Sequence, residues 1–303
     1  MPDALRDDLI ALHGLWGNER LAVVRGVGYP QPDRSHFRSM DVWQSGSPGH
    51  PEHTGWIGRW LDATGADPLR AVSAGSVPPP LMAGETCAGA AVPLGPLSVP
   101  TGPIGSGVAA LSEQSPGEPA MQAAAARGVA DLLRLQSALQ PVTGIAGEPG
   151  DSGPAEDEIR RCIEARTPTP VYAVSLGGFD THADEKGTQS RLLSELDAAL
   201  TGFLDGVEGR PVVVAVYSEF GRRVEANASQ GTDHGTAGTM LIAGSPVRGG
   251  LYGEQPSLTK LRDGDLAVTT DFRSVYATLL EEVLGTDAES VLEDAPDRIP
   301  LIA

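Results

Sequence analysis

The chain has 303 residues and a formal net charge of −18, because 40 Asp and Glu outnumber 22 Lys and Arg. This acidic balance argues against nucleic-acid binding, which depends on clustered basic side chains that neutralise phosphates, and against docking on anionic lipid. The hydrophobic fraction of 40% is typical of a globular protein, and no apolar stretch approaches the roughly 20 residues that span a bilayer. We therefore expect one globular domain over residues 1–303, with no nucleic-acid partner and no membrane span.

The first elements predicted along the chain are a helix, a strand and a second helix. Apolar residues recur at helical spacing over residues 5–16, and they are not preceded by the basic segment and apolar core of an export signal. An apolar run at residues 21–24 predicts a buried strand. A second helix then ends near residues 45–46, and its predicted inner face consists of Phe37, Met40 and Trp43.

Glycine and proline mark two loop-rich insertions in the middle of the chain. They cover residues 73–117, which we expect to be loops and short extended pieces, and residues 141–154. Between them, the Ala- and Leu-rich residues 120–139 predict a helix.

Strands and helices alternate in the remainder of the chain, which is typical of an α/β protein. Residues 192–204 keep a helical period, and Asp271 is placed to cap a last helix over residues 272–284. Continuous apolar runs indicate strands that are buried on both faces, as in a parallel sheet. These runs are residues 171–176, 211–217 and 239–243.

The chain has two cysteines, Cys87 and Cys162. Two cysteines define neither a disulfide framework nor a zinc site. We expect each to be a buried free thiol, although they could pair in an exported protein.

Polar residues lie beside three of the predicted strands, near the sheet edge where open α/β sheets bind ligands. Two clusters follow strands 171–176 and 211–217, and a third directly precedes strand 239–243. Carboxylate oxygens and imidazole nitrogens suit zinc, manganese or a similar divalent ion. The candidate ligands are Asp180, His182, Glu219, Asp233 and His234.

Each of these clusters also has a purely structural interpretation. The segment around Asp180 fits a helix-capping turn. Glu219 fits a simple ion pair with Arg222 or Arg223. The segment around Asp233 fits an exposed turn. The sequence alone leaves these alternatives open.

Ser35 is placed near a helix N-terminus, where free N–H groups and the helix dipole favour an anion. A functional interpretation makes Ser35 a nucleophile toward a phosphoryl or sulfuryl centre, with Arg34 or Arg38 on the developing negative charge. In the structural interpretation, Ser35 or Asp33 merely caps the helix.

Several strings together resemble the domain of unknown function 1501 family, over nearly the whole chain. The strings are VVRGVGYP (23–30), RSHFRSMDVWQ (34–44), GGFDTHAD (177–184), YSEFGRR (217–223), GTDHGTAG (231–238), GGLYG (249–253) and TTDFRSVYA (269–277). That family is similar to the alkaline phosphatase and sulfatase superfamily. The resemblance therefore implies a three-layer α/β sandwich with a mostly parallel central sheet, a divalent-metal site and a nucleophile at a helix start.

The resemblance also implies roles for the metal-site residues. Asp180 and His182 match the first acidic/histidine metal pair of the superfamily. Glu219 matches the next strand-end ligand, and His234, with Asp233, matches the late histidine ligand. Phenylalanine follows Glu219 where the superfamily usually has Asp-His, so a second metal would lose a ligand.

The nucleophile position falls on Ser35 or, as an alternative, on His36. The candidate substrate-binding residues are Arg34, Arg38 and Arg222.

Members of the family typically begin with a twin-arginine export signal and a first strand that leads into a Gly/Asp-rich turn. This chain as written starts after both, which predicts a sandwich lacking its first strand. The neighbouring strands would then have unpaired edges, and the metal site would lack one carboxylate. Without a signal, the chain as written is expected in the cytoplasm unless the true start lies upstream.

Two functions follow as expectations from different classes. The first is a metal-dependent hydrolase acting on a phosphate or sulfate ester, with chemistry that is intact or impaired. The alternative is a non-catalytic exported scaffold or binding protein that retains the fold. A third candidate, an α/β-hydrolase nucleophile elbow at residues 71–75, is disfavoured because Ala71 replaces the first glycine and a Pro-rich loop follows.

Overall fold

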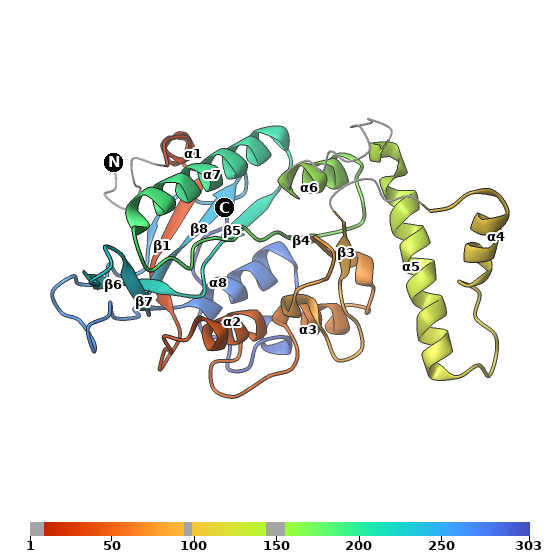
Figure 1. Ribbon diagram of the computed structural model, residues 1–303, viewed down its shortest axis with the longest axis horizontal. Coiled ribbons are helices and arrows are strands. Elements are labelled where there is room, and N and C mark those ends of the chain that lie inside the picture. The colour runs from red at the N-terminus through yellow and green to blue at the C-terminus, as the bar shows by residue number, and fades with distance from the viewer. Residues whose placement is uncertain (1–8, 94–98, 144–154) are drawn as a thin grey trace.

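The computed structural model describes residues 9–93, 99–143 and 155–303. It is a mixed α/β structure with a five-stranded sheet, a three-stranded sheet and a two-stranded hairpin. Helices pack on both faces of the largest sheet (Figure 1). The expected α/β class is confirmed at this level.

The largest sheet has the strand order β10-β1-β8-β5, and β9 also pairs with β1. Its strands are β1 (Leu21–Gly28), β5 (Val213–Val216), β8 (Gly238–Gly244), β9 (Gly250–Tyr252) and β10 (Thr270–Asp271). β1 runs parallel to β9 and β10, but β8 runs antiparallel to both β1 and β5. The sheet is therefore mixed rather than all parallel: β8 runs against the other four strands, which share one direction. A parallel neighbour needs a long crossover, whereas the chain passes from β5 to β8 through the hairpin of β6 (Gly221–Ala226) and β7 (Thr232–Gly235).

Strand β1 lies between two apolar layers, one on each face of the sheet. Its side chains alternate between the two faces of the sheet: Leu21 and Val23 belong to one apolar cluster, and Ala22 and Val24 belong to the other. All four are fully buried. The predicted strand at residues 21–24 is thus confirmed and extends to Gly28.

Each apolar layer is covered by its own helices. On one face, α1 (Leu12–Gly17) and α7 (Glu185–Gly206) contribute buried leucines. On the other face lie α2 (His36–Ser45), α3 (Trp56–Ala63) and α8 (Phe272–Thr278), the last continued by a π-helical turn, η3 (Leu279–Val283). Trp43 of α2 is buried there, but Phe37 is 75% exposed, so its predicted place on the inner face is wrong. Asp271 caps α8 through the backbone N–H of Arg273, as predicted.

The second sheet consists of three parallel strands in the order β3-β2-β4. They are β2 (Ala71–Ala74), β3 (Ala90–Val92) and β4 (Val171–Ala173). β4 is shorter than the predicted strand 171–176, and the residues beyond it are partly exposed: Val174 by 47% and Leu176 by 38%. Within the described residues β4 pairs only with β2 and β5 only with β8, so both are edge strands, and their residues are partly buried where full burial was predicted.

The remaining helices lie around this body. They are η1 (Pro68–Arg70), η2 (Pro80–Met82), α4 (Gly102–Ala110), α5 (Ala120–Thr143), α6 (Ala155–Glu164) and η4 (Ala288–Ser290). In Figure 1, α4 and α5 stand well away from the large sheet. α4 is a helix within 73–117, where only loops and extended pieces were expected. Most of the second expected insertion, residues 144–154, lies outside the described residues.

Two further expectations concern membranes and thiols. Among the described residues, no helix is both long and apolar enough to cross a membrane. Both cysteines are buried thiols that form no disulfide, as expected.

Candidate metal centre

The candidate site forms where the loop after β4 meets the β6–β7 hairpin. The loop carries Asp180 and His182, and β7 carries His234. The two segments approach so closely that a Cβ on Gly231 would lie 2.5 Å from the carbonyl oxygen of His182. A side chain at this position would therefore push the loop away from the hairpin.

Asp180, His182 and His234 converge on one point. Asp180 Oδ1 lies 2.8 Å from His234 Nε2 and 3.1 Å from His182 Nε2. One ligand atom from each of the three residues falls within 4.8 Å of the others. Two segments more than fifty residues apart thus bring one carboxylate and two imidazoles together.

The burial of the three residues differs. The His234 side chain is 9% exposed and stacks on Phe220 at a centroid distance of 4.1 Å. The side chains of Asp180 and His182 are about half exposed, at 51% and 49%. The site is therefore closed on the side of the buried His234 and open to solvent on the side of Asp180 and His182.

The donor set fits a divalent ion. Ligands bound at 2.0–2.2 Å around a tetrahedral ion lie roughly 3.3–3.6 Å apart. The observed separations of 2.8 and 3.1 Å are slightly shorter, so a small outward movement of each donor makes room for an ion. One carboxylate and two imidazoles suit zinc, manganese or similar metals. Three protein ligands also leave a coordination position open, as catalytic zinc sites do.

Electrostatics keep the central carboxylate charged. Desolvation tends to raise the pKa of Asp180, but it is outweighed by hydrogen bonds from His234 and His182 and by charge attraction from His234 and His36. The pKa of Asp180 is therefore lower than the ordinary aspartate value. An ionised carboxylate is the form that binds a metal.

Asp233 lies beside the triad, on the far side of His182. Its Oδ1 is 3.4 Å from His182 Nδ1, the nitrogen that faces away from Asp180. A hydrogen bond from Asn227, together with His182, lowers the pKa of Asp233. A carboxylate on the second nitrogen of a ligating histidine fixes the orientation of the ring. The geometry thus gives Asp233 an orienting position, whereas the sequence suggested a ligand.

Arg222 lies under the loop, and its guanidinium binds backbone groups. It donates hydrogen bonds to the carbonyl oxygens of Phe179, Thr181 and Thr232. Its Nε lies 3.3 Å from the buried carboxylate of Glu185. Arg222 therefore holds the loop that carries Asp180, and its donors are not turned toward a substrate as the resemblance suggested.

The structural alternatives that the sequence left open are now decided. The N-cap of α7 is Asp184, without a side-chain hydrogen bond, so Asp180 is not a capping residue. Glu219 faces His36, with Oε1 3.7 Å from Nδ1, while Arg222 and Arg223 pair with Glu185 and Asp265. His234 is a buried strand residue and does not lie in an exposed turn.

His36 is the residue of the 29–43 segment that reaches the site. Its Nε2 lies 3.7 Å from Asp180 Oδ2, and its ring meets the His234 ring edge-to-face at 5.5 Å. Ser35 is the exposed N-cap residue of α2, where its side chain makes no capping hydrogen bond. Its backbone N–H donates to Asp33 Oδ1.

The two arginines of this segment differ in their surroundings. Arg34 pairs with the buried carboxylate of Asp265 at 2.9 Å and donates to the carbonyl oxygen of Asp263. Arg38 forms no ion pair with the described residues. Of the three proposed substrate-binding arginines, Arg38 is thus the one whose charge is not neutralised by an ion pair with another described residue.

Sequence reasoning missed two residues that support the site. Glu185 is 5% exposed and accepts hydrogen bonds from the backbone and hydroxyl of Thr232. Asn227 donates to the carbonyl oxygen of His182 and to Asp233. Glu185 directly follows the motif GGFDTHAD, but nothing local in the sequence indicates that it would be buried against Arg222.

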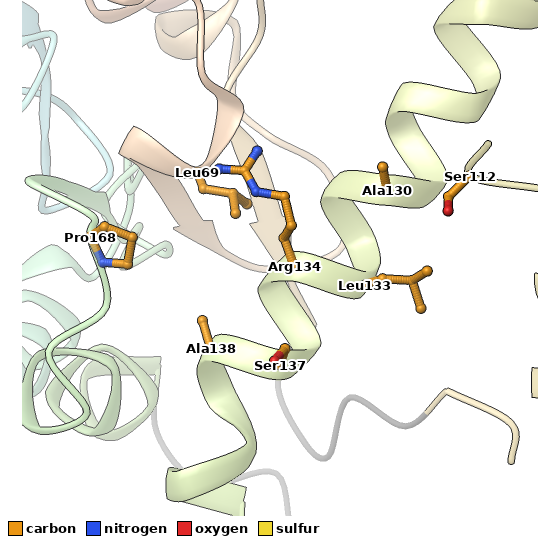
Figure 2. Close-up of a pocket in the computed structure, with 8 residues that line it drawn as sticks. All are labelled: Leu69, Ser112, Ala130, Leu133, Arg134, Ser137, Ala138 and Pro168. Carbon is orange, nitrogen blue, oxygen red and sulfur yellow. The ribbon is translucent and has the colours of Figure 1, made fainter. Parts of the chain in front are cut away.

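A pocket elsewhere in the molecule contains no such chemistry. It has a volume of about 570 Å³ and lies between α5 and the η1 region (Figure 2). Figure 2 shows small and apolar side chains around Arg134, whose guanidinium pairs with Asp67 and Asp131. The triad residues do not line this pocket.

Comparisons with known proteins identify a family but no characterised relative. Residues 102–298 match the family described as "Protein of unknown function (DUF1501)". No curated protein matches the chain, and no solved structure matches it. The matched region includes the triad but begins after Ser35 and His36, so it is shorter than the resemblance over nearly the whole chain.

Proposed function

Since the chain belongs to the DUF1501 family, we propose that it is a divalent-metal-dependent hydrolase of the alkaline phosphatase and sulfatase type, acting on a phosphate or sulfate ester. The observation that carries this proposal is the convergence of Asp180, His182 and His234, with Asp180 Oδ1 2.8 and 3.1 Å from the two imidazole nitrogens. Bound at these residues, a divalent ion would supply a Lewis acid that polarises the ester oxygen.

The other residues of the proposed site have separate roles. Ser35 is the nucleophile of the proposal, because it is exposed at the start of α2 and directly precedes His36, which contacts Asp180. Arg38 is the cation available to stabilise negative charge on the transferred group. Arg222 and Asp233 orient the loop and the His182 ring, respectively.

The fold part of the proposal is an alkaline-phosphatase-like sandwich. Helices on both faces of the large sheet support it. The antiparallel direction of β8 and the separation of β4 from β5 are departures from an uninterrupted, all-parallel sheet.

Metal analysis and turnover test this proposal together. Purified wild-type protein is assayed for bound metal by elemental analysis, then for hydrolysis of aryl phosphate and aryl sulfate with added zinc or manganese. We expect metal binding that is lost in Asp180→Ala and His234→Ala, and turnover that is lost in Ser35→Ala with metal binding retained. Wild-type protein that neither binds metal nor hydrolyses either ester contradicts the proposal.

A second function is a metal-binding scaffold without hydrolysis, which could act after export. One observation favours it: Arg34 and Arg222 are engaged with protein groups, which leaves few cations for a transferred anion. The same experiment separates the two functions. Metal binding that depends on Asp180 and His234, without turnover of either ester, supports the scaffold.

A further inference from the structure

The two oxygens of Asp180 face different histidines. Oδ1 lies at 2.8 and 3.1 Å from the Nε2 atoms of His234 and His182. Oδ2 lies 3.7 Å from His36 Nε2. The ligand triad uses the first oxygen, so the second is free to be held by a group outside the triad.

His36 in turn has a carboxylate on its other nitrogen. Its Nδ1 lies 3.7 Å from Glu219 Oε1. The contacts on both nitrogens are about 0.5 Å longer than the upper end of ordinary N–H···O hydrogen bonds. A small side-chain movement would therefore bring both contacts to hydrogen-bond distance and link Glu219 through His36 to Asp180.

The surroundings hold the His36 ring in this orientation. The ring packs on Phe37 at a centroid distance of 4.1 Å and meets the rings of His234 and Phe220 nearly perpendicularly. Its backbone is fixed as the first residue of α2. The side chain is 27% exposed, compared with 49% for His182.

Glu219 is suited to act on His36 and poorly placed to act on the ion. Its side chain is 14% exposed, and a partly buried carboxylate needs a charged or hydrogen-bonding partner. Within the described residues, its ion-pair contact is His36. The set of mutually close ligand atoms contains the triad residues and neither Glu219 nor His36.

We infer that Glu219 and His36 are positioning residues that act through Asp180, and that they are not a metal ligand and a nucleophile. Glu219 fixes the His36 ring through Nδ1, and His36 Nε2 holds the outer oxygen of Asp180 so that the inner oxygen faces the ion. This inference rests on the proposed metal site, because it assigns the contacts that orient one of its ligands. Outer partners of metal ligands typically contribute 10- to 100-fold to metal affinity.

The experiment compares zinc or manganese affinity among variants at the two positions. We expect His36→Ala and Glu219→Leu each to weaken binding by about 10- to 100-fold. His36→Gln keeps an amide donor and Glu219→Gln keeps an acceptor, so both should recover most of that loss. The double variant His36→Ala/Glu219→Leu should be no weaker than His36→Ala, because Glu219 acts only through His36.

A matched control is present elsewhere in the chain. His50 and Glu293 form another histidine–carboxylate pair, at 2.6 Å. His50→Gln and Glu293→Gln change the same residue types outside the site, so we expect them to leave metal affinity unchanged.

Electron paramagnetic resonance of the Cu(II)-loaded protein distinguishes a positioning residue from a ligand. We expect nitrogen couplings from two imidazoles in wild type and still from two in His36→Ala. Three in wild type and two in His36→Ala would make His36 a ligand and overturn the inference. Unchanged affinity in both His36→Ala and Glu219→Leu would overturn it as well, while wild-type protein that binds no metal would instead defeat the proposed metal site.

Discussion

Replacement of Arg222 by methionine tests whether the loop that carries Asp180 is held by a buried ion pair. The Arg222 side chain is 18% exposed and that of Glu185 is 7% exposed. Removing one partner of a buried pair typically costs about 3–5 kcal/mol, because the other charge is left uncompensated. Glu185 keeps hydrogen bonds from the backbone N–H and hydroxyl of Thr232, at 2.6 and 2.7 Å. We therefore expect a loss near the lower limit, about 3 kcal/mol.

The assay is urea denaturation of wild type and Arg222→Met, followed by thermal unfolding. A loss of this size lowers the melting temperature by roughly 5 °C in a chain of this length. Arg222→Lys should recover only part of the stability, because lysine keeps the charge but cannot bind several carbonyl oxygens at once. Metal affinity should fall in parallel, since the carbonyl oxygens of Phe179 and Thr181 on either side of Asp180 lose their donors.

Two controls define the result that would refute this reasoning. Arg191 pairs with Glu195 on the surface of α7, with both side chains at least half exposed, so Arg191→Met should cost less than about 1 kcal/mol. The double variant Arg222→Met/Glu185→Leu should be more stable than Arg222→Met, because the unpaired charge is removed. An Arg222→Met variant as stable as Arg191→Met would show that the ion pair does not hold the loop.

Three further predictions concern a close contact, an acid-sensitive carboxylate and a thiol. Gly231→Ala should weaken metal binding with little change in helix content by circular dichroism, because its Cβ would lie 2.5 Å from the His182 carbonyl oxygen; unchanged affinity contradicts this. Desolvation tends to raise the pKa of Asp62, but hydrogen bonds from Thr86, Glu85 and Cys87 outweigh it and lower the pKa. The contribution of Asp62 to the stability of the fold is therefore present above the unfolded pKa near 4, and it is lost as the pH falls through the folded pKa. Asp62→Asn should therefore cost about 2 kcal/mol at pH 7 and less at pH 3 by urea denaturation, and a cost independent of pH would contradict the linkage. Burial raises the pKa of Cys87 to about 11, so native protein should react with a thiol reagent at pH 8 far more slowly than urea-unfolded protein does.

Local pattern was sufficient for several elements. The apolar run at residues 21–24 and the helical period at 192–204 predicted β1 and α7, because burial on both faces and amphipathic spacing are recorded in adjacent residues. The pattern failed for Phe37, which has helical spacing but lies on the exposed side of α2 beside His36. It also did not show that β8 runs antiparallel to its neighbours, because strand direction depends on how two distant segments are connected.

The sequence by itself determined the set of chemical groups: an Asp-Thr-His segment, a Glu-Phe pair and an Asp-His pair near strand ends, on an acidic chain with few cations. Only the tertiary structure decided their roles. It brought Asp180, His182 and His234 together, turned Arg222 toward backbone carbonyls and placed His36 between Asp180 and Glu219. The physical reason is that residue type fixes which atoms can bind a cation or donate a hydrogen bond. Their separation and orientation depend on packing between segments more than fifty residues apart, which local sequence does not encode.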